Sequence, residues 1–172
     1  MESLFEPSDM TDAILVVEGK KLHVNKALLS YHSDYFKNLF SGNTRKKEFP
    51  IGGVTYTLFS TLLSFVHSKP IVPDESSIYS LLMLADQFLI PAAKRHIELI
   101  LISSIPRNEK LAQYAFQYRL NELTEIMLKQ FYQQRDHKVF TNVRRSDWFK
   151  KLPDKDQVEV MLMYLKIVRA RA

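Results

Sequence analysis

The hydrophobic period of the sequence changes near Thr55, and this change sets the class of fold. Before it, Asp12–Glu18 and Lys21–Val24 are short runs rich in β-branched and aliphatic residues, with Gly19–Lys20 between them. Such a pattern predicts a β-hairpin. From Thr55 onward, apolar residues recur every three or four positions, which predicts helices. The chain is therefore expected to be α+β, with a small β-sheet followed by a largely helical remainder.

Polar residues mark the expected starts of helices. Asn25 and Ser33 each precede a short apolar run, at 26–30 and 34–40, and both side chains are good N-caps. Residues 48–51 predict a third short strand, which the proline within it confines to a sheet edge. We therefore expect two short helices between the hairpin and a third, edge strand.

Later helices are expected to form hairpins. Thr55 caps the first, Ser76 or Ser77 starts the next, and Pro91 suits the first turn of another that runs to residue 102. A degenerate repeat, Ala85–Ile90 and later 115–120, predicts stacked helix pairs.

The last expected helix, Asp154–Arg169, is amphipathic. Its apolar stripe consists of Val158, Met161, Leu162, Leu165 and Val168. Because exposed apolar side chains of this size cost about 1.5 to 3 kcal/mol each, we predict that the first four pack on the helices of residues 108–131.

Charge is concentrated near the C-terminus. The net charge is +5, and residues 132–172 hold ten Lys and Arg against five Asp and Glu. The mixed signs favour a solvated helix face. Nucleic-acid binding is the alternative, and its signature would be steep weakening with salt. Its candidate residues are Arg144, Arg145, Lys150 and Lys151.

The residues that most enzymes and metal sites need are missing or scattered. There is no cysteine, no phosphate-binding glycine loop and no G-x-S-x-G motif. Five dispersed histidines lack a metal-ligand spacing: His23, His32, His67, His96 and His137. We expect no enzymatic activity, small-molecule substrate, cofactor or metal.

The most apolar stretch, Ile97–Ile105, is interrupted by polar residues and is far shorter than the ~20 residues of a bilayer crossing. The N-terminal segment lacks the basic and apolar regions of a signal peptide. The expected location is intracellular, in the cytoplasm, the nucleus or both, without membrane association.

Three segments in this order resemble the signatures of BTB/POZ domains: Ser8–Val17, Leu22–Phe40 and Leu81–Phe88. The resemblance covers about residues 10–103 and is nearest to nematode proteins with a BTB domain alone or behind a MATH domain. It implies a small β-sheet capped by helical hairpins, commonly dimeric, that builds protein complexes. The expected domains are a BTB/POZ domain with an N-terminal arm at 1–105 and a helical extension of BACK-like helix pairs at 106–172.

The resemblance also implies a dimer interface. In the family, an acidic residue of the first strand and a basic residue of the first helix lie at the dimer centre, and Asp12 and Lys26 occupy these positions. Alternatively, Asp12 ends a turn and Lys26 is an exposed first-turn residue. Leu4 and Phe5 would be hidden by a twofold partner, or by their own chain.

Family members that bind cullin-3 use the loop after the second signature helix, here 41–47, together with the neighbouring helical hairpin. This loop lacks the hydrophobic-x-Glu motif that such adaptors place there. The candidate partner face consists of Asn43, Arg45, Tyr79, Met83 and Gln87. Alternatively, the tyrosine and methionine belong to the core.

The expected function is a homodimerising adaptor that recruits a cullin-3 type ubiquitin ligase scaffold and positions a client protein. The alternative is a structural or transcription-related oligomerisation module that binds no ligase.

Overall fold

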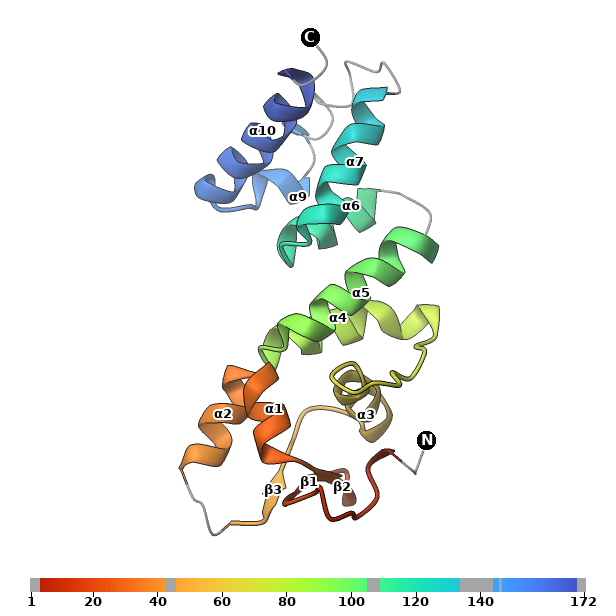
Figure 1. Ribbon diagram of the computed structural model, residues 1–172. Helices are drawn as coiled ribbons and strands as arrows, with labels where there is room; N and C mark the ends of the chain where they lie inside the picture. The colour runs from red at the N-terminus through yellow and green to blue at the C-terminus, as the bar shows by residue number, and fades with distance from the viewer. Residues whose placement is uncertain (1–3, 43–45, 105–108, 134–143, 146, 170–172) are drawn as a thin grey trace. The chain divides into compact units, whose positions relative to one another are not determined.

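The computed structural model describes residues 4–42, 46–104, 109–133, 144–145 and 147–169 (Figure 1). Contacts divide the chain into two compact units, Met1–Ile97 and Glu98–Ala172.

The first unit contains a three-stranded sheet in the order β2-β1-β3. Strands β1 (Ala13–Val17) and β2 (Lys20–Val24) form an antiparallel hairpin. The two residues between them, Glu18 and Gly19, both have positive φ, at 50° and 74°. This geometry is that of a two-residue turn whose twist matches the strands. The predicted hairpin is therefore confirmed.

Strand β3 (Glu48–Pro50) pairs in parallel with β1 and forms an edge of the sheet. Pro50, which lacks an N–H, is therefore tolerated. The prediction of an edge strand here is confirmed. Side chains of β1 alternate, with Ala13, Leu15 and Val17 buried, so one sheet face supplies part of the core.

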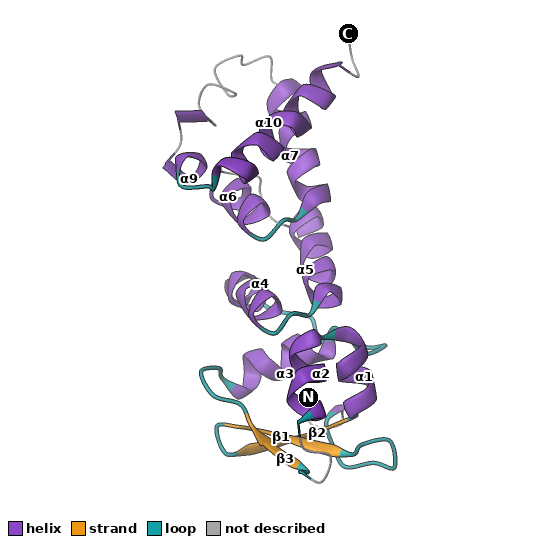
Figure 2. Ribbon diagram, turned by 90° about the vertical axis from the view of Figure 1, so that its left-hand side faces the viewer, coloured by secondary structure: helices purple, strands orange, loops and turns teal. Residues whose placement is uncertain are grey.

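Helical segments described in the first unit follow or interrupt the sheet: α1 (Lys26–His32), α2 (Asp34–Ser41), α3 (Tyr56–Ser64), the short 3-10 helix η2 (Glu75–Ser77) and α4 (Ile78–Gln87). Figure 2 shows α1, α2 and α3 covering one face of the sheet.

Three of the predicted N-caps are confirmed. The side-chain oxygens of Asn25, Ser33 and Thr55 accept hydrogen bonds from the third backbone N–H that follows, at 2.8, 3.2 and 3.4 Å. The expected start at Ser76 or Ser77 is confirmed in position, because Ser77 is the N-cap residue of α4, but the Ser77 side chain makes no capping hydrogen bond. There Asp74 accepts from the Ser77 N–H at 2.8 Å and starts η2, from which α4 continues.

Aromatic side chains fill the core of the first unit. The rings of Phe36 and Phe88 are stacked with centres 6.1 Å apart, and Phe59 contacts Phe88 edge-on at 5.0 Å. The buried Ser33 hydroxyl donates to the Phe88 carbonyl at 2.7 Å. The end of α4 is thereby joined to the start of α2.

Helix α5 (Pro91–Ser104) runs across the division between the units. The second unit continues with α6 (Glu109–Gln117), α7 (Asn121–Gln133), α9 (Asp147–Lys150) and α10 (Asp154–Arg169). The bounds of α10 are those expected from the sequence. Three strands and a helical remainder confirm the α+β class.

The sequence repeat is also a structural repeat. In one copy, the Ile90 N–H bonds to the Ala85 carbonyl at 2.9 Å, and Leu89 has a φ of 50°. In the other, the Leu120 N–H bonds to the Ala115 carbonyl at 2.8 Å, and Arg119 has a φ of 54°. Both α4 and α6 therefore end in the same Schellman motif.

Candidate interaction surfaces

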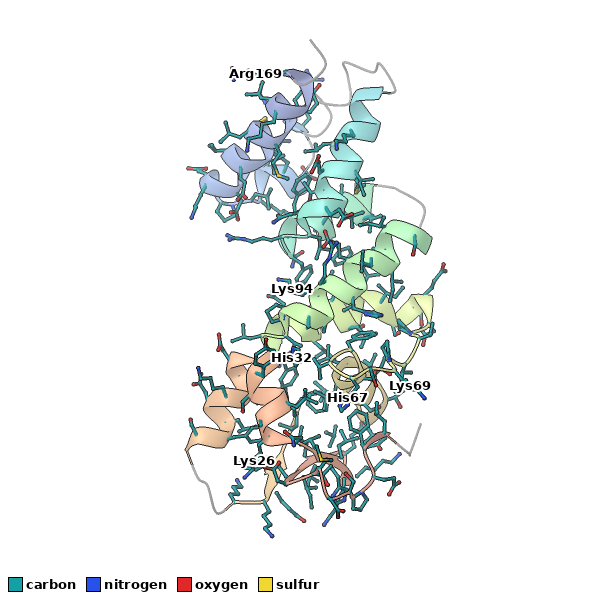
Figure 3. All side chains as sticks on the ribbon, in the orientation of Figure 1. Lys26, His32, His67, Lys69, Lys94 and Arg169 are labelled. Carbon is teal, nitrogen blue, oxygen red and sulfur yellow. The ribbon has the colours of Figure 1, made fainter. Side chains whose placement is uncertain are left out.

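Asp12 and Lys26 meet through the backbone. Asp12 Oδ1 accepts a hydrogen bond from the Lys26 N–H at 2.7 Å. The Lys26 ammonium donates instead to the Lys46 carbonyl at 3.1 Å and lies 5.5 Å from the centre of the Phe49 ring (Figure 3). Within one chain, the carboxylate thus stabilises the start of α1. The role of both residues at a dimer centre stays a prediction.

The N-terminal arm packs on its own chain. Phe5 is only 4% exposed, and its ring meets that of His67 edge-on at 5.7 Å. The His23 N–H donates to the Phe5 carbonyl at 3.0 Å. Leu4 is half-buried. Phe5 is therefore buried by its own chain, which was the second of the two alternatives for this arm, and no partner is needed to remove it from water.

The candidate partner face on α4 is open. Met83 is 51% exposed, Gln87 is exposed and Tyr79 is half-buried. The alternative that placed Met83 in the core is therefore wrong. Asn43 and Arg45 lie outside the described residues.

Leu89, 52% exposed just beyond α4, was not anticipated as part of any surface. Its positive φ is shared with Arg119 of the second repeat copy. The sequence repeat, which includes both residues, was the one signal that could have drawn attention to Leu89.

The packing predicted for α10 is wrong. Val158, Leu162 and Leu165 are 56%, 53% and 47% exposed, and Met161 is half-buried. The side chain of Val168 lies outside the described ones.

The opposite face of α10 makes the contacts instead. Val160 is buried at 3% exposure, and the Asp156 carboxylate lies 3.4 Å from the Arg119 guanidinium. Helix α10 thus has two apolar faces, and among the described residues α7 and its neighbours cover only one of them.

Titratable side chains do not form a metal-binding cluster in the part of the chain that the structure describes. No group of three or more His, Asp or Glu side chains is placed there to hold a metal ion. Partial burial, and secondarily the charge of His32, lower the pKa of His67. No helix among the described residues is long and apolar enough to cross a bilayer.

The arrangement of a small sheet under helices, with an α4–α5 helical hairpin, agrees with a comparison against family models. The model of the BTB/POZ domain matches residues 1–105. This chain belongs to the BTB/POZ family. Members of that family are protein-interaction modules, so the BTB protein described here is one as well.

Two curated relatives are nematode proteins. A BTB/POZ domain-containing protein of Caenorhabditis elegans is 40% identical over 72% of this chain and 40% of its own length. BTB and MATH domain-containing protein 36 of the same species is 32% identical over 76% of this chain and 42% of its own length. The BTB chain thus spans about two fifths of these relatives. Among solved structures, the BTB domain of zebrafish PATZ1 matches 55% of the chain at 24% identity and a TM-score of 0.48, covering 77% of that structure.

Proposed function

We propose that this BTB protein is an intracellular, homodimerising adaptor, acting in the cytoplasm or the nucleus. One of its surfaces recruits a cullin-3 type ubiquitin ligase scaffold, and its helical extension positions a client protein. The observation that carries the recruitment step is the open face of α4, where a large flexible apolar side chain, Met83, is half exposed in a folded domain.

The composition of this face suits a protein partner. Tyr79, Met83 and Gln87 recur every four residues and so follow one side of α4. Methionine adapts its shape to a partner surface, and tyrosine is enriched among residues that dominate binding energy. The polar Gln87 at the end of the row resembles the polar rim of such interfaces.

The test of recruitment is titration calorimetry of the full chain against the N-terminal domain of cullin-3. We expect submicromolar binding at one cullin per protomer. Met83→Glu should weaken it at least tenfold, because a charge would be buried in an apolar contact. Met10→Glu is the matched control, since Met10 is 74% exposed and lies outside the α4 face. Binding that survives Met83→Glu unchanged would place the cullin elsewhere.

The proposed dimer can be tested apart from folding at Asp12. Asp12→Asn keeps an acceptor for the Lys26 N–H and removes the charge. If the charge acts at the dimer centre, light scattering should show dissociation at concentrations where the unaltered chain is dimeric. A monomeric mass of the unaltered chain at micromolar concentration would contradict the dimer.

A specific feature favours the alternative, an oligomerisation module without ligase binding, structural or related to transcription. Residues 41–47 contain no hydrophobic-x-Glu anchor. A well-folded dimer that gives no heat with cullin-3 would support this alternative, and the absent anchor would be the reason.

A further inference from the structure

The outward face of α10 is an apolar surface without a partner among the residues that the structure describes. Val158, Leu162 and Leu165 are each about half exposed, and their spacing of four and three residues aligns them along one side of the helix. The other large exposed apolar side chains that the structure describes are spread over the first unit and α5. Exposed apolar rows of this kind mark interaction sites.

Opposite charges stand at the two ends of this row. Asp154 is the first residue of α10, and Arg169, which is labelled in Figure 3, is the last. At 3.6 residues per turn both fall on the side that carries Leu165 and Leu162. Both side chains are exposed, and neither has an ion pair among the described residues.

We propose that α10 pairs with α10 of a second copy of this chain, antiparallel, about a twofold axis beside Leu162. In this register Val158 faces the partner's Leu165, and the two Leu162 side chains meet at the axis. The same register brings Asp154 against the partner's Arg169 at both ends. A single twofold arrangement thus covers the apolar row and matches its terminal charges, as a self-complementary interface requires.

An open hollow beside the row provides depth for the contact. It has a volume of about 580 Å³, lies between α9 and α10, and is lined in part by Phe149, Val158 and Met161. Because it borders Val158, the partner's Leu165 reaches it in the antiparallel register. The side chain of the partner's Leu165 then inserts into the hollow, as a knob packs into a hole between paired helices.

A partner of different chemistry is the competing occupant. Basic residues flank the row, namely Arg144, Lys150, Lys155 and Lys166, and an acidic amphipathic segment would match them. Asp154 also lines the hollow and would then face like charge. A second copy places Asp154 against an arginine instead, which is why we favour it.

The absence of cysteine from the chain permits a position-specific test. Leu162→Cys in the full chain should give a covalent dimer with a short bismaleimide crosslinker, because the position faces itself. Val158→Cys mixed with Leu165→Cys should crosslink as a heterodimer, and Val158→Cys alone should not. Efficient crosslinking of Val158→Cys with itself would indicate a parallel pair and overturn the proposal. Gln113→Cys, exposed on α6, is the control for random collision.

Charge exchange tests the register separately. Asp154→Arg or Arg169→Asp alone should weaken association about fivefold, as expected for exposed pairs, and the double variant should restore it. In the Asp12→Asn background, which removes the proposed BTB dimer, Leu162→Glu should convert the remaining dimer to a monomer, with unchanged circular dichroism. Asp12→Asn, which addresses the proposed BTB dimer, should leave Leu162→Cys crosslinking intact.

Two further outcomes would overturn the pairing. One is the absence of crosslinking at Leu162→Cys above the Gln113→Cys control. The other combines two results: Leu162→Cys does not crosslink, and the cullin-3 N-terminal domain or an acidic amphipathic peptide protects this cysteine from a maleimide dye. That combination would assign the face to the protecting partner.

Discussion

Glu98 is a buried carboxylate whose role is to complete another helix. It is 6% exposed, and its Oε1 accepts hydrogen bonds from the backbone N–H groups of Glu122 and Leu123, at 2.9 and 3.0 Å. These N–H groups belong to the first turn of α7 (Asn121–Gln133), where helical partners are lacking. A negative charge there is also favoured by the helix dipole. A side chain from α5 thus stabilises the start of α7.

Glu98→Ala should destabilise the second unit by about 1 to 3 kcal/mol, because two backbone donors lose their acceptor. Urea denaturation followed by circular dichroism measures the change. Glu125→Ala is the matched control: its carboxylate pairs with Lys129 on the exposed side of α7, so its loss should cost only about 0.3 to 0.5 kcal/mol. Equal effects of the two substitutions would contradict the capping role.

His67 makes stability depend on pH. Partial burial, together with His32, lowers its pKa in the folded chain below the usual 6.5. As pH falls below 6.5, the unfolded chain therefore binds a proton before the folded chain does. This contribution to unfolding free energy is constant above pH 6.5 and decreases as pH falls toward the folded pKa.

Replacing His67 by Gln removes the group that titrates and should flatten the stability profile between pH 7.5 and 5. Urea midpoints at each pH provide the measurement. His23→Gln, on β2 (Lys20–Val24), serves as the comparison. A profile as steep in His67→Gln as in the unaltered chain would exclude His67 as its source.

Two helices end with a non-glycine residue in the left-handed region. Leu89 and Arg119 have φ of 50° and 54°, which costs about 1 to 2 kcal/mol for a residue with a Cβ. Leu89→Gly and Arg119→Gly should each stabilise the chain by roughly 0.5 to 1 kcal/mol, after the entropy that glycine adds to the unfolded state. Gln113→Gly, in the right-handed interior of α6, should destabilise it by about 1 kcal/mol. Thermal denaturation of the three variants measures this reversal of sign.

Local chemistry explains which elements could be predicted. The hairpin, the edge strand and the caps at Asn25, Ser33 and Thr55 depend on neighbours within a few residues, and all are present. The cap at Asp74 was missed because Ser76 and Ser77 compete for the same role nearby. The Schellman motifs of α4 and α6 were not predicted, because no glycine marks them, although both lie within the sequence repeat.

Packing between elements was harder to predict. Helix α10 carries apolar residues on two sides, Val160 on one and Val158, Leu162 and Leu165 on the other. The periodicity of the sequence shows that such rows exist, but it does not show which row packs against the other helices of the chain. The candidate faces of α4 and α10 would bind molecules outside the chain. The spacing of the residues on each face could therefore be predicted from the sequence, but the partners could not.

At the scale of the whole molecule, two boundaries lie close together. The BTB family model ends at residue 105, where the sequence predicts the domain boundary, and the first compact unit ends at Ile97. Helix α5 (Pro91–Ser104) contains the end of the first unit, and the family model ends one residue beyond this helix. Its first half therefore belongs to the core of one unit and its second half, with Glu98 and the fully buried Leu101, to the other.

This division predicts two regions of different local stability. Leu101→Ala should destabilise the second unit by about 2 to 5 kcal/mol, as do other buried leucine truncations, and leave the sheet and α3 protected. Leu62→Ala, equally buried in α3, is the matched change in the first unit. Hydrogen exchange read by mass spectrometry distinguishes them: the first should accelerate exchange in α6 and α7, the second in β1 and α3. If both substitutions accelerate exchange uniformly along the chain, the BTB unit and the helical extension unfold as one cooperative body, and the division within α5 is one of contacts alone.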